Sequence, residues 1–216
     1  MPYLPNEREY RSMPVMKIAD TAEERLIDSE YYVQGYATTF NQPYVLFKDD
    51  EYTYYEQVDR AAFNEADMSD VIFLHNHTGK CLARNKMKVG KEPTLILRSD
   101  DVGLFVAADL GIIEEGREEW RAITGGLVYQ MSFGFTVAED EVTEIEKGSY
   151  LRTIKRIKRL YDVSSVDMPA NPYTAIDTNA RSAFEGYIER QKQELQRAEE
   201  RKRQIQRIRI LSEVNK

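Results

Sequence analysis

The feature that most constrains this chain is a succession of short runs rich in Tyr, Val, Thr, Phe and Ile after residue 30. Such residues favour strands because their branched or aromatic side chains pack well on a pleated surface. We expect strands at residues 32–39, 71–75, 94–98, 102–107, 131–137, 150–154 and 160–166. Glycines and short loops separate many of these runs. The pattern therefore predicts an α+β fold that is mainly β, with a closed or nearly closed antiparallel β-barrel core and a few flanking helices.

Two segments break the strand pattern and indicate helices. Residues 114–129 begin with acids and carry Trp120, Ile123 and Leu127 at spacings of three and four, which predicts a helix with one buried stripe. The pair Gly125-Gly126 weakens the end of this helix. After residue 181 the chain is rich in Glu, Gln, Lys and Arg with a thin apolar stripe, which predicts a terminal helix of roughly thirty residues.

These shifts in composition divide the chain into three parts. Residues 1–30 mix prolines with charges and are expected to form an N-terminal arm, either flexible or a lone edge strand, with little chemistry. Residues 31–180 are expected to form the core domain, which two prolines at 169 and 172 bring to an end. Residues 181–216 are expected to form a charged helical tail.

Charge and cysteine content narrow the function classes. The formal net charge of -7 gives no general attraction to phosphate, so we expect no nucleic-acid partner. No apolar run reaches the roughly 18 residues of a membrane-crossing helix, and the N-terminus lacks the pattern of a signal peptide. A single cysteine cannot form an internal disulfide. These observations predict a soluble intracellular protein.

His75 and His77 are the only histidines, so any imidazole chemistry near neutral pH must use one of them. His75 ends a predicted strand, where a rigid element can aim its side chain into a cleft. Ser132 stands between the large apolar residues Met131 and Phe133, directly after the predicted helix. In a strand, Ser132 and Gly134 would share the face opposite Met131 and Phe133. A serine in such an alternating strand is more often an ordinary polar residue than a catalytic one.

Asp162 interrupts an apolar, strand-like run. An acid inside a buried strand is costly unless it is paired, and a histidine is one partner that would satisfy it. An outward-facing acid beside Lys158 and Arg159 is the alternative reading.

In chain order, these clusters resemble the motifs of the phage prohead protease family, whose fold is similar to that of the herpesvirus assembly proteases. The resemblance covers roughly residues 31–178. The matching segments are residues 33–41, an acid-rich strand and short helix at 56–63, Leu74-His75-Asn76 with Leu82-Ala83-Arg84, residues 101–104, Met131-Ser132-Phe133-Gly134-Phe135, Asp162-Val163-Ser164, and Pro169-Ala170-Asn171-Pro172.

The resemblance implies a serine endopeptidase with Ser132 as nucleophile, His75 as general base and Asp162 as the acid that orients the base. The implied enzyme needs no cofactor or metal. Asn76 stands where an aspartate is common in the family, and Ala83 where a glycine is common. Asp162 stands where a glutamate is frequent. Herpesvirus-type enzymes use a second histidine as third member, which makes His77 a distant alternative for that position.

The implied substrates are scaffold protein and the major capsid protein, cut in the host cytoplasm inside the assembling procapsid. Self-cleavage in the exposed tail is expected as well, and self-association stays open. The rival interpretation is a non-catalytic scaffold or capsid-assembly protein that acts through the C-terminal helix.

A nuclease based on the tripeptide His75-Asn76-His77 is not expected, because that motif name denotes residues spread over a metal-binding hairpin and helix. A zinc site using Cys81 lacks a coherent ligand spacing, and a lone cysteine is more often a packed residue than a nucleophile.

Overall fold

The structure is a computed structural model that describes residues 8–13, 16–17, 25–48, 50–167, 186–189, 192–193, 196–197 and 200–204. The chain separates into two compact units, one of Leu4–Ile176 and one of Met1–Tyr3 with Asp177–Lys216. The first unit contains β1 (Glu9–Met13), β2 (Met16–Lys17), β3 (Tyr32–Thr39), β4 (Tyr44–Lys48), β5 (Thr53–Val58), β6 (Ile72–His75), β7 (Thr78–Arg84), β8 (Leu95–Ser99), β9 (Gly103–Asp109), α1 (Glu114–Thr124), β10 (Gln130–Glu146) and β11 (Ser149–Val166).

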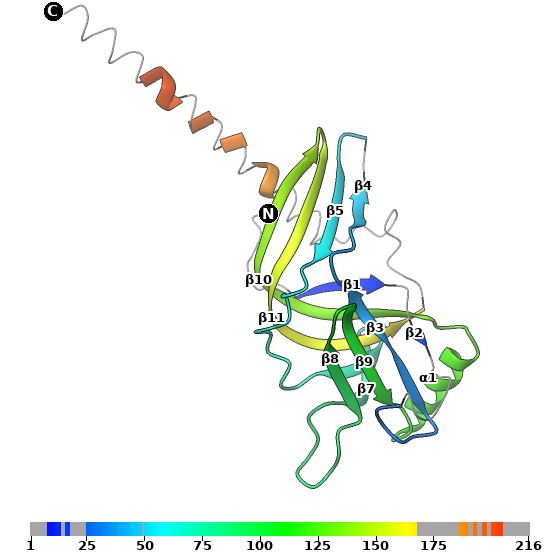
Figure 1. The fold of residues 1–216 in the computed structure, drawn as a ribbon. Coiled ribbons are helices and arrows are strands. Elements are labelled where there is room, and N and C mark those ends of the chain that lie inside the picture. The colour runs from blue at the N-terminus through cyan, green and yellow to red at the C-terminus, as the bar shows by residue number, and fades with distance from the viewer. Residues whose placement is uncertain are drawn as a thin grey trace, which may run out of the picture. The chain divides into compact units, whose positions relative to one another are not determined.

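The strands form two sheets (Figure 1). The larger has the order β1-β10-β11-β5-β4, and β6 also pairs with β11 and carries β7 at its other edge. The smaller has the order β2-β3-β9-β8. The mainly β class with few helices is confirmed. The predicted closed barrel is not supported, because neither sheet closes on itself in the described part of the chain.

The longest strands explain why the barrel prediction fails. The predicted strands at 150–154 and 160–166 are two parts of the single strand β11, which pairs antiparallel with β10 along nearly its whole length. β5 pairs in parallel with the first part of β11, and β6 pairs in parallel with the last part. Short loops between strand-like runs suggested antiparallel neighbours, whereas these two parallel pairings join segments that are distant in sequence.

The other elements of the structure differ from the predicted ones mainly in the residues at which they begin and end. β3 has the predicted bounds, whereas residues 56–63 form the end of β5 followed by turns rather than a short helix. Helix α1 stops at Thr124, and Gly126 adopts a φ of 74°. Leu127, expected on the buried stripe, lies beyond the helix and is 76% exposed. The glycine pair therefore ends the helix one turn earlier than the apolar spacing suggested.

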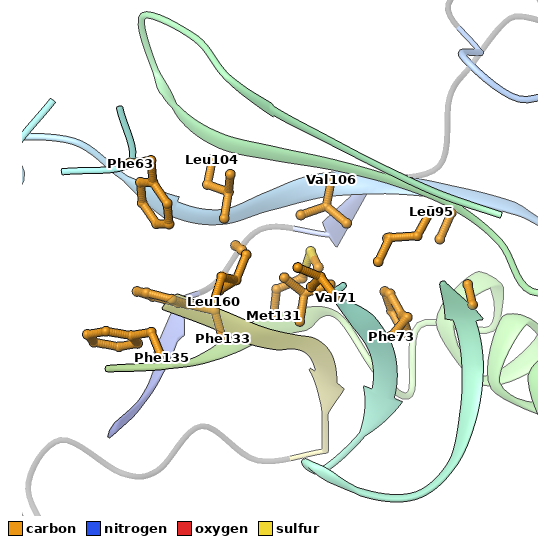
Figure 2. Close-up of a cluster of buried hydrophobic side chains, with 14 of the residues drawn as sticks. Phe63, Val71, Phe73, Leu95, Leu104, Val106, Met131, Phe133, Phe135 and Leu160 are labelled. Carbon is orange, nitrogen blue, oxygen red and sulfur yellow. The ribbon is translucent and has the colours of Figure 1, made fainter. Parts of the chain in front are cut away.

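The hydrophobic core lies between the two sheets (Figure 2). Leu104 and Val106 of β9 point toward Met131 and Leu160 of the larger sheet. Met131, Phe133 and Phe135 are all at most 1% exposed and belong to this core. Strand alternation therefore places the intervening Ser132 and Gly134 on the opposite face, as predicted.

The described residues of the tail, 186–189, 192–193, 196–197 and 200–204, are helical, and all of those from 189 on are exposed. The closing motif at 169–172 and most of the predicted apolar stripe of the tail lie outside the described residues. Within the described parts of the chain, no helix is both long enough and apolar enough to cross a membrane.

Candidate active site

The register of β10 on β11 brings two predicted site residues onto one face of the larger sheet. Ser132 lies opposite Ser164, and Gly134 lies opposite Asp162. Ser132 and Asp162 are both 0% exposed. The polar side chains therefore need partners in the protein, because water does not reach them.

A histidine reaches these residues from the tight turn between β6 and β7. His75 pairs with Thr78, so Asn76 and His77 are the two central residues of the turn. Their φ angles of 48° and 57° place both in the left-handed region, as two-residue hairpins of this type require. The parallel pairing of β6 with β11 places His75 beside Ser165, which brings the turn to the end of β11 near Ser164.

The imidazole of His77 lies between the serine and the aspartate. Its Nε2 is 2.6 Å from Ser132 Oγ, and its Nδ1 is 2.6 Å from Asp162 Oδ1. The side chain of His77 is 16% exposed. A hydroxyl, an imidazole and a carboxylate are thus joined by hydrogen bonds in the order that proton transfer from the serine requires.

Asp162 is stabilised in its ionised form. Burial raises the pKa of this carboxyl, but the hydrogen bond and charge of His77, the Ser164 hydroxyl and the charge of Arg8 outweigh burial and hold the pKa below its usual value. Ser164 Oγ donates to Asp162 Oδ1 at 2.8 Å. The inward pairing with a histidine is therefore correct for Asp162, and the outward-facing alternative beside Lys158 and Arg159 is wrong.

The structure places His77, and not His75, beside Ser132. His75 was expected at Ser132, but its Nδ1 lies 3.0 Å from Glu119 Oε2 and its Nε2 lies 3.3 Å from Asp167 Oδ2. A continued strand would have put His75 and His77 on one face. The chain instead turns at Asn76, so the two imidazoles point to different partners. Strand periodicity could not predict where the His77 side chain points, because the alternation of faces holds only within one continuous strand and the chain reverses at this turn.

Three further residues at the site were not assigned from the sequence. Ser164 lies within a quoted motif, and its Oγ is also 3.2 Å from His77 Nδ1. Arg8 forms an ion pair with Asp162 Oδ2, and the ring of Tyr10 lies 4.2 Å from the His77 ring. Both belong to the segment that was expected to hold little chemistry. Their sequence context gives no signal, since only the pairing of β1 with β10 brings them to the site.

Cys81 has the properties of a protonated surface thiol. The residue is exposed, its Sγ donates to the carbonyl of Ala83 at 3.2 Å, and partial desolvation of the sulfur is the main cause that raises the pKa of the thiol. A thiol with a raised pKa is a poor nucleophile near neutral pH. Among the residues that the structure describes, no three His, Cys, Asp or Glu side chains are grouped as metal ligands would be.

A Ser-His-Asp chain of contacts on a rigid scaffold is the arrangement of serine hydrolases, which occur on several unrelated folds. The family model described as Caudovirus prohead serine protease matches residues 18–187, which is most of the chain. The protein therefore belongs to the Caudovirus prohead serine protease family, and the resemblance drawn from the motifs is confirmed. Membership implies serine peptidase activity and a role in capsid maturation. Neither the curated proteins nor the solved structures contain a match to the chain.

Proposed function

We propose that the chain is a serine endopeptidase in which Ser132 is the nucleophile, His77 the general base and Asp162 the acid that orients the base. The supporting observation is the pair of 2.6 Å contacts that His77 makes to the other two side chains. In this reaction His77 Nε2 takes the hydroxyl proton as Ser132 Oγ bonds to the substrate carbonyl carbon. The same proton then passes to the leaving amine, and water hydrolyses the acyl-enzyme by the reverse route.

Asp162 and Ser164 prepare the imidazole for this step. The contact of Asp162 with Nδ1 keeps the proton on that nitrogen, so that Nε2 is free to accept one from the serine. The ionised carboxylate also stabilises the imidazolium that forms. The Ser164 hydroxyl donates to Oδ1, the same carboxylate oxygen that contacts His77, and helps to fix its orientation.

We further propose that the substrates are scaffold protein and the scaffold-like extension of the major capsid protein, cut inside the assembling procapsid in the host cytoplasm. Family membership supports this class of substrate. The chain's own tail, residues 181–216, is a further candidate substrate, because its described residues from 189 on are exposed. A charged helical tail that docks on scaffold would also raise the local concentration of the protease at its substrate.

The two histidines provide a matched test of the proposed site. We expect Ser132→Ala, His77→Gln and Asp162→Asn to lower kcat by roughly 10⁴-fold, because each removes one member of the proton-transfer chain. We expect His75→Gln to stay within about tenfold of wild type, since His75 contacts Glu119 and Asp167 rather than Ser132.

The assay is cleavage of purified scaffold protein, with fragment masses measured over time. Equal cleavage by wild type and Ser132→Ala would refute a serine peptidase at this site. Loss of activity in His75→Gln with full activity in His77→Gln would refute the choice of histidine. An intact tail on active enzyme recovered from mature particles would argue against self-cleavage.

A further inference from the structure

The N-terminal strand β1 lies directly beside the nucleophile strand. It pairs antiparallel with β10, with Ser12 opposite Ser132 and Tyr10 opposite Gly134. The family match begins at residue 18, so this strand lies before the matched segment. Its contribution to the site is therefore a property of this chain that the family match does not cover.

Arg8, which directly precedes β1, and Tyr10, on one face of β1, contact two of the proposed catalytic residues. The guanidinium of Arg8 pairs with Asp162 Oδ2, while Oδ1 of the same carboxylate contacts His77. Arg8 lies between aromatic rings, 5.2 Å from the Tyr10 centroid and 4.6 Å from the Tyr161 centroid. The Tyr10 ring is tilted by 54° against the His77 ring at 4.2 Å. These contacts restrict the motion of both Asp162 and His77.

The nucleophile strand leaves space for these side chains at Gly134. A Cβ added there would lie 2.8 Å from Tyr10 Cε1 and 3.0 Å from Arg8 Nε, and closer still to Asp162 Oδ2. An aromatic residue directly opposite a glycine in a sheet covers the bare backbone and fixes the register. The glycine of the nucleophile motif therefore leaves room for the side chains of Arg8 and Tyr10 as well as for that of Asp162.

The other face of β1 anchors the strand. Glu9 and Arg11 are 5% and 3% exposed and join a buried ion cluster with Glu56 and Arg152. Arg152 donates from Nη1 and Nη2 to the two carboxylate oxygens of Glu9, at 2.7 and 2.9 Å. A buried charge cannot leave its partners without a large cost, so β1 is held firmly in this register.

We propose that β1 completes the proteolytic site and that Arg8 and Tyr10 are positioning residues, with Arg8 holding the carboxylate of Asp162 and Tyr10 holding the imidazole of His77. This inference rests on the proposed function of the three catalytic residues. Each of Arg8 and Tyr10 acts through the catalytic residue that it contacts.

Arg8 acts on the imidazole of His77 through the carboxylate of Asp162. In the described part of the chain, His77 faces Ser132 on β10, Asp162 and Ser164 on β11, and Tyr10 on β1, with Arg8 behind Asp162. With Oδ2 held by Arg8, Oδ1 of the same carboxylate stays directed at His77, so a substitution that breaks this ion pair should lower kcat rather than weaken substrate binding.

The experiment compares wild type with Arg8→Gln, Arg8→Lys, Tyr10→Leu and Tyr10→Phe in cleavage of a scaffold-derived peptide. We expect kcat to fall roughly 10 to 100-fold in Arg8→Gln and Tyr10→Leu with KM within about threefold, since positioning errors act on the chemical step. We expect Arg8→Lys and Tyr10→Phe to recover most of the loss.

Arg60→Gln is the matched control, because Arg60 pairs with Asp101 at an exposed position and contacts no proposed catalytic residue. A wild-type kcat in Arg8→Gln would overturn the proposal for Arg8, and equal activity of Tyr10→Leu and wild type would overturn it for Tyr10. If Arg8→Gln fails to fold, an Arg8→Lys variant as inactive as Ser132→Ala overturns the positioning role. A wild type no more active than Ser132→Ala would instead refute the proposed function.

Discussion

Gly134→Ala tests whether the site depends on close packing at the nucleophile strand. An ordinary contact begins at about 3.4 Å, and the added Cβ would lie 2.8 Å from Tyr10 Cε1. The tyrosine ring must therefore move by about 0.6 Å. Asp162 Oδ2 lies nearer to the new atom and must move further, on the order of 1 Å, which typically costs about 10²-fold in rate. The same overpacking should destabilise the fold by roughly 1–3 kcal/mol.

The measurements are kcat/KM on a scaffold-derived peptide and the free energy of unfolding in urea. Gly90→Ala serves as the control, because Gly90 has a φ of 81° and no atom within 4 Å of its added Cβ. That variant carries a backbone cost of about 1 kcal/mol without altering the site, so its kcat/KM should equal that of wild type. If Gly134→Ala retains kcat/KM within about threefold of wild type, the close packing of Asp162 against Gly134 does not matter for catalysis.

Two further predictions concern the buried ion cluster. Arg152→Met should lower the unfolding free energy by roughly 3–5 kcal/mol, since it leaves Glu9 and Glu56 with one cation fewer in the interior. The control is Arg156→Met, which should lower the unfolding free energy by under about 1 kcal/mol because Arg156 is half-exposed. Equal losses of stability in the two variants, measured by urea unfolding, would contradict the role of burial. Burial raises the pKa of Glu9, but Arg11 and Arg152 outweigh it and lower that pKa from 4.5 to about 2. The stabilisation from Glu9, on the order of 3 kcal/mol, is therefore present above pH about 4.5 and lost as the pH falls toward 2. Stability of Glu9→Gln measured across this range should depend less on pH than that of wild type, and parallel curves would contradict the assignment.

Sequence patterns that depend on near neighbours predicted the corresponding parts of the structure well. The run at Tyr32–Thr39 has the bounds of β3, and alternation at Met131 and Phe133 placed Ser132 on the face away from the core. The cost of a carboxylate inside an apolar run made pairing with a histidine one of two interpretations of Asp162, and its partner in the structure is a histidine. The ordered motifs identified the family without reference to geometry.

Only the tertiary structure decided which residues meet. The parallel pairing of β5 and β6 with β11 joins distant segments, and the turn at Asn76 presents His77 rather than His75 to Ser132. Arg8 lies 154 positions from Asp162 along the chain, and the two meet because β1 docks on β10. Periodicity reports the local conformation and the buried face of a segment. It does not report the partner strand, since pairing depends on the free energy of the whole assembled sheet.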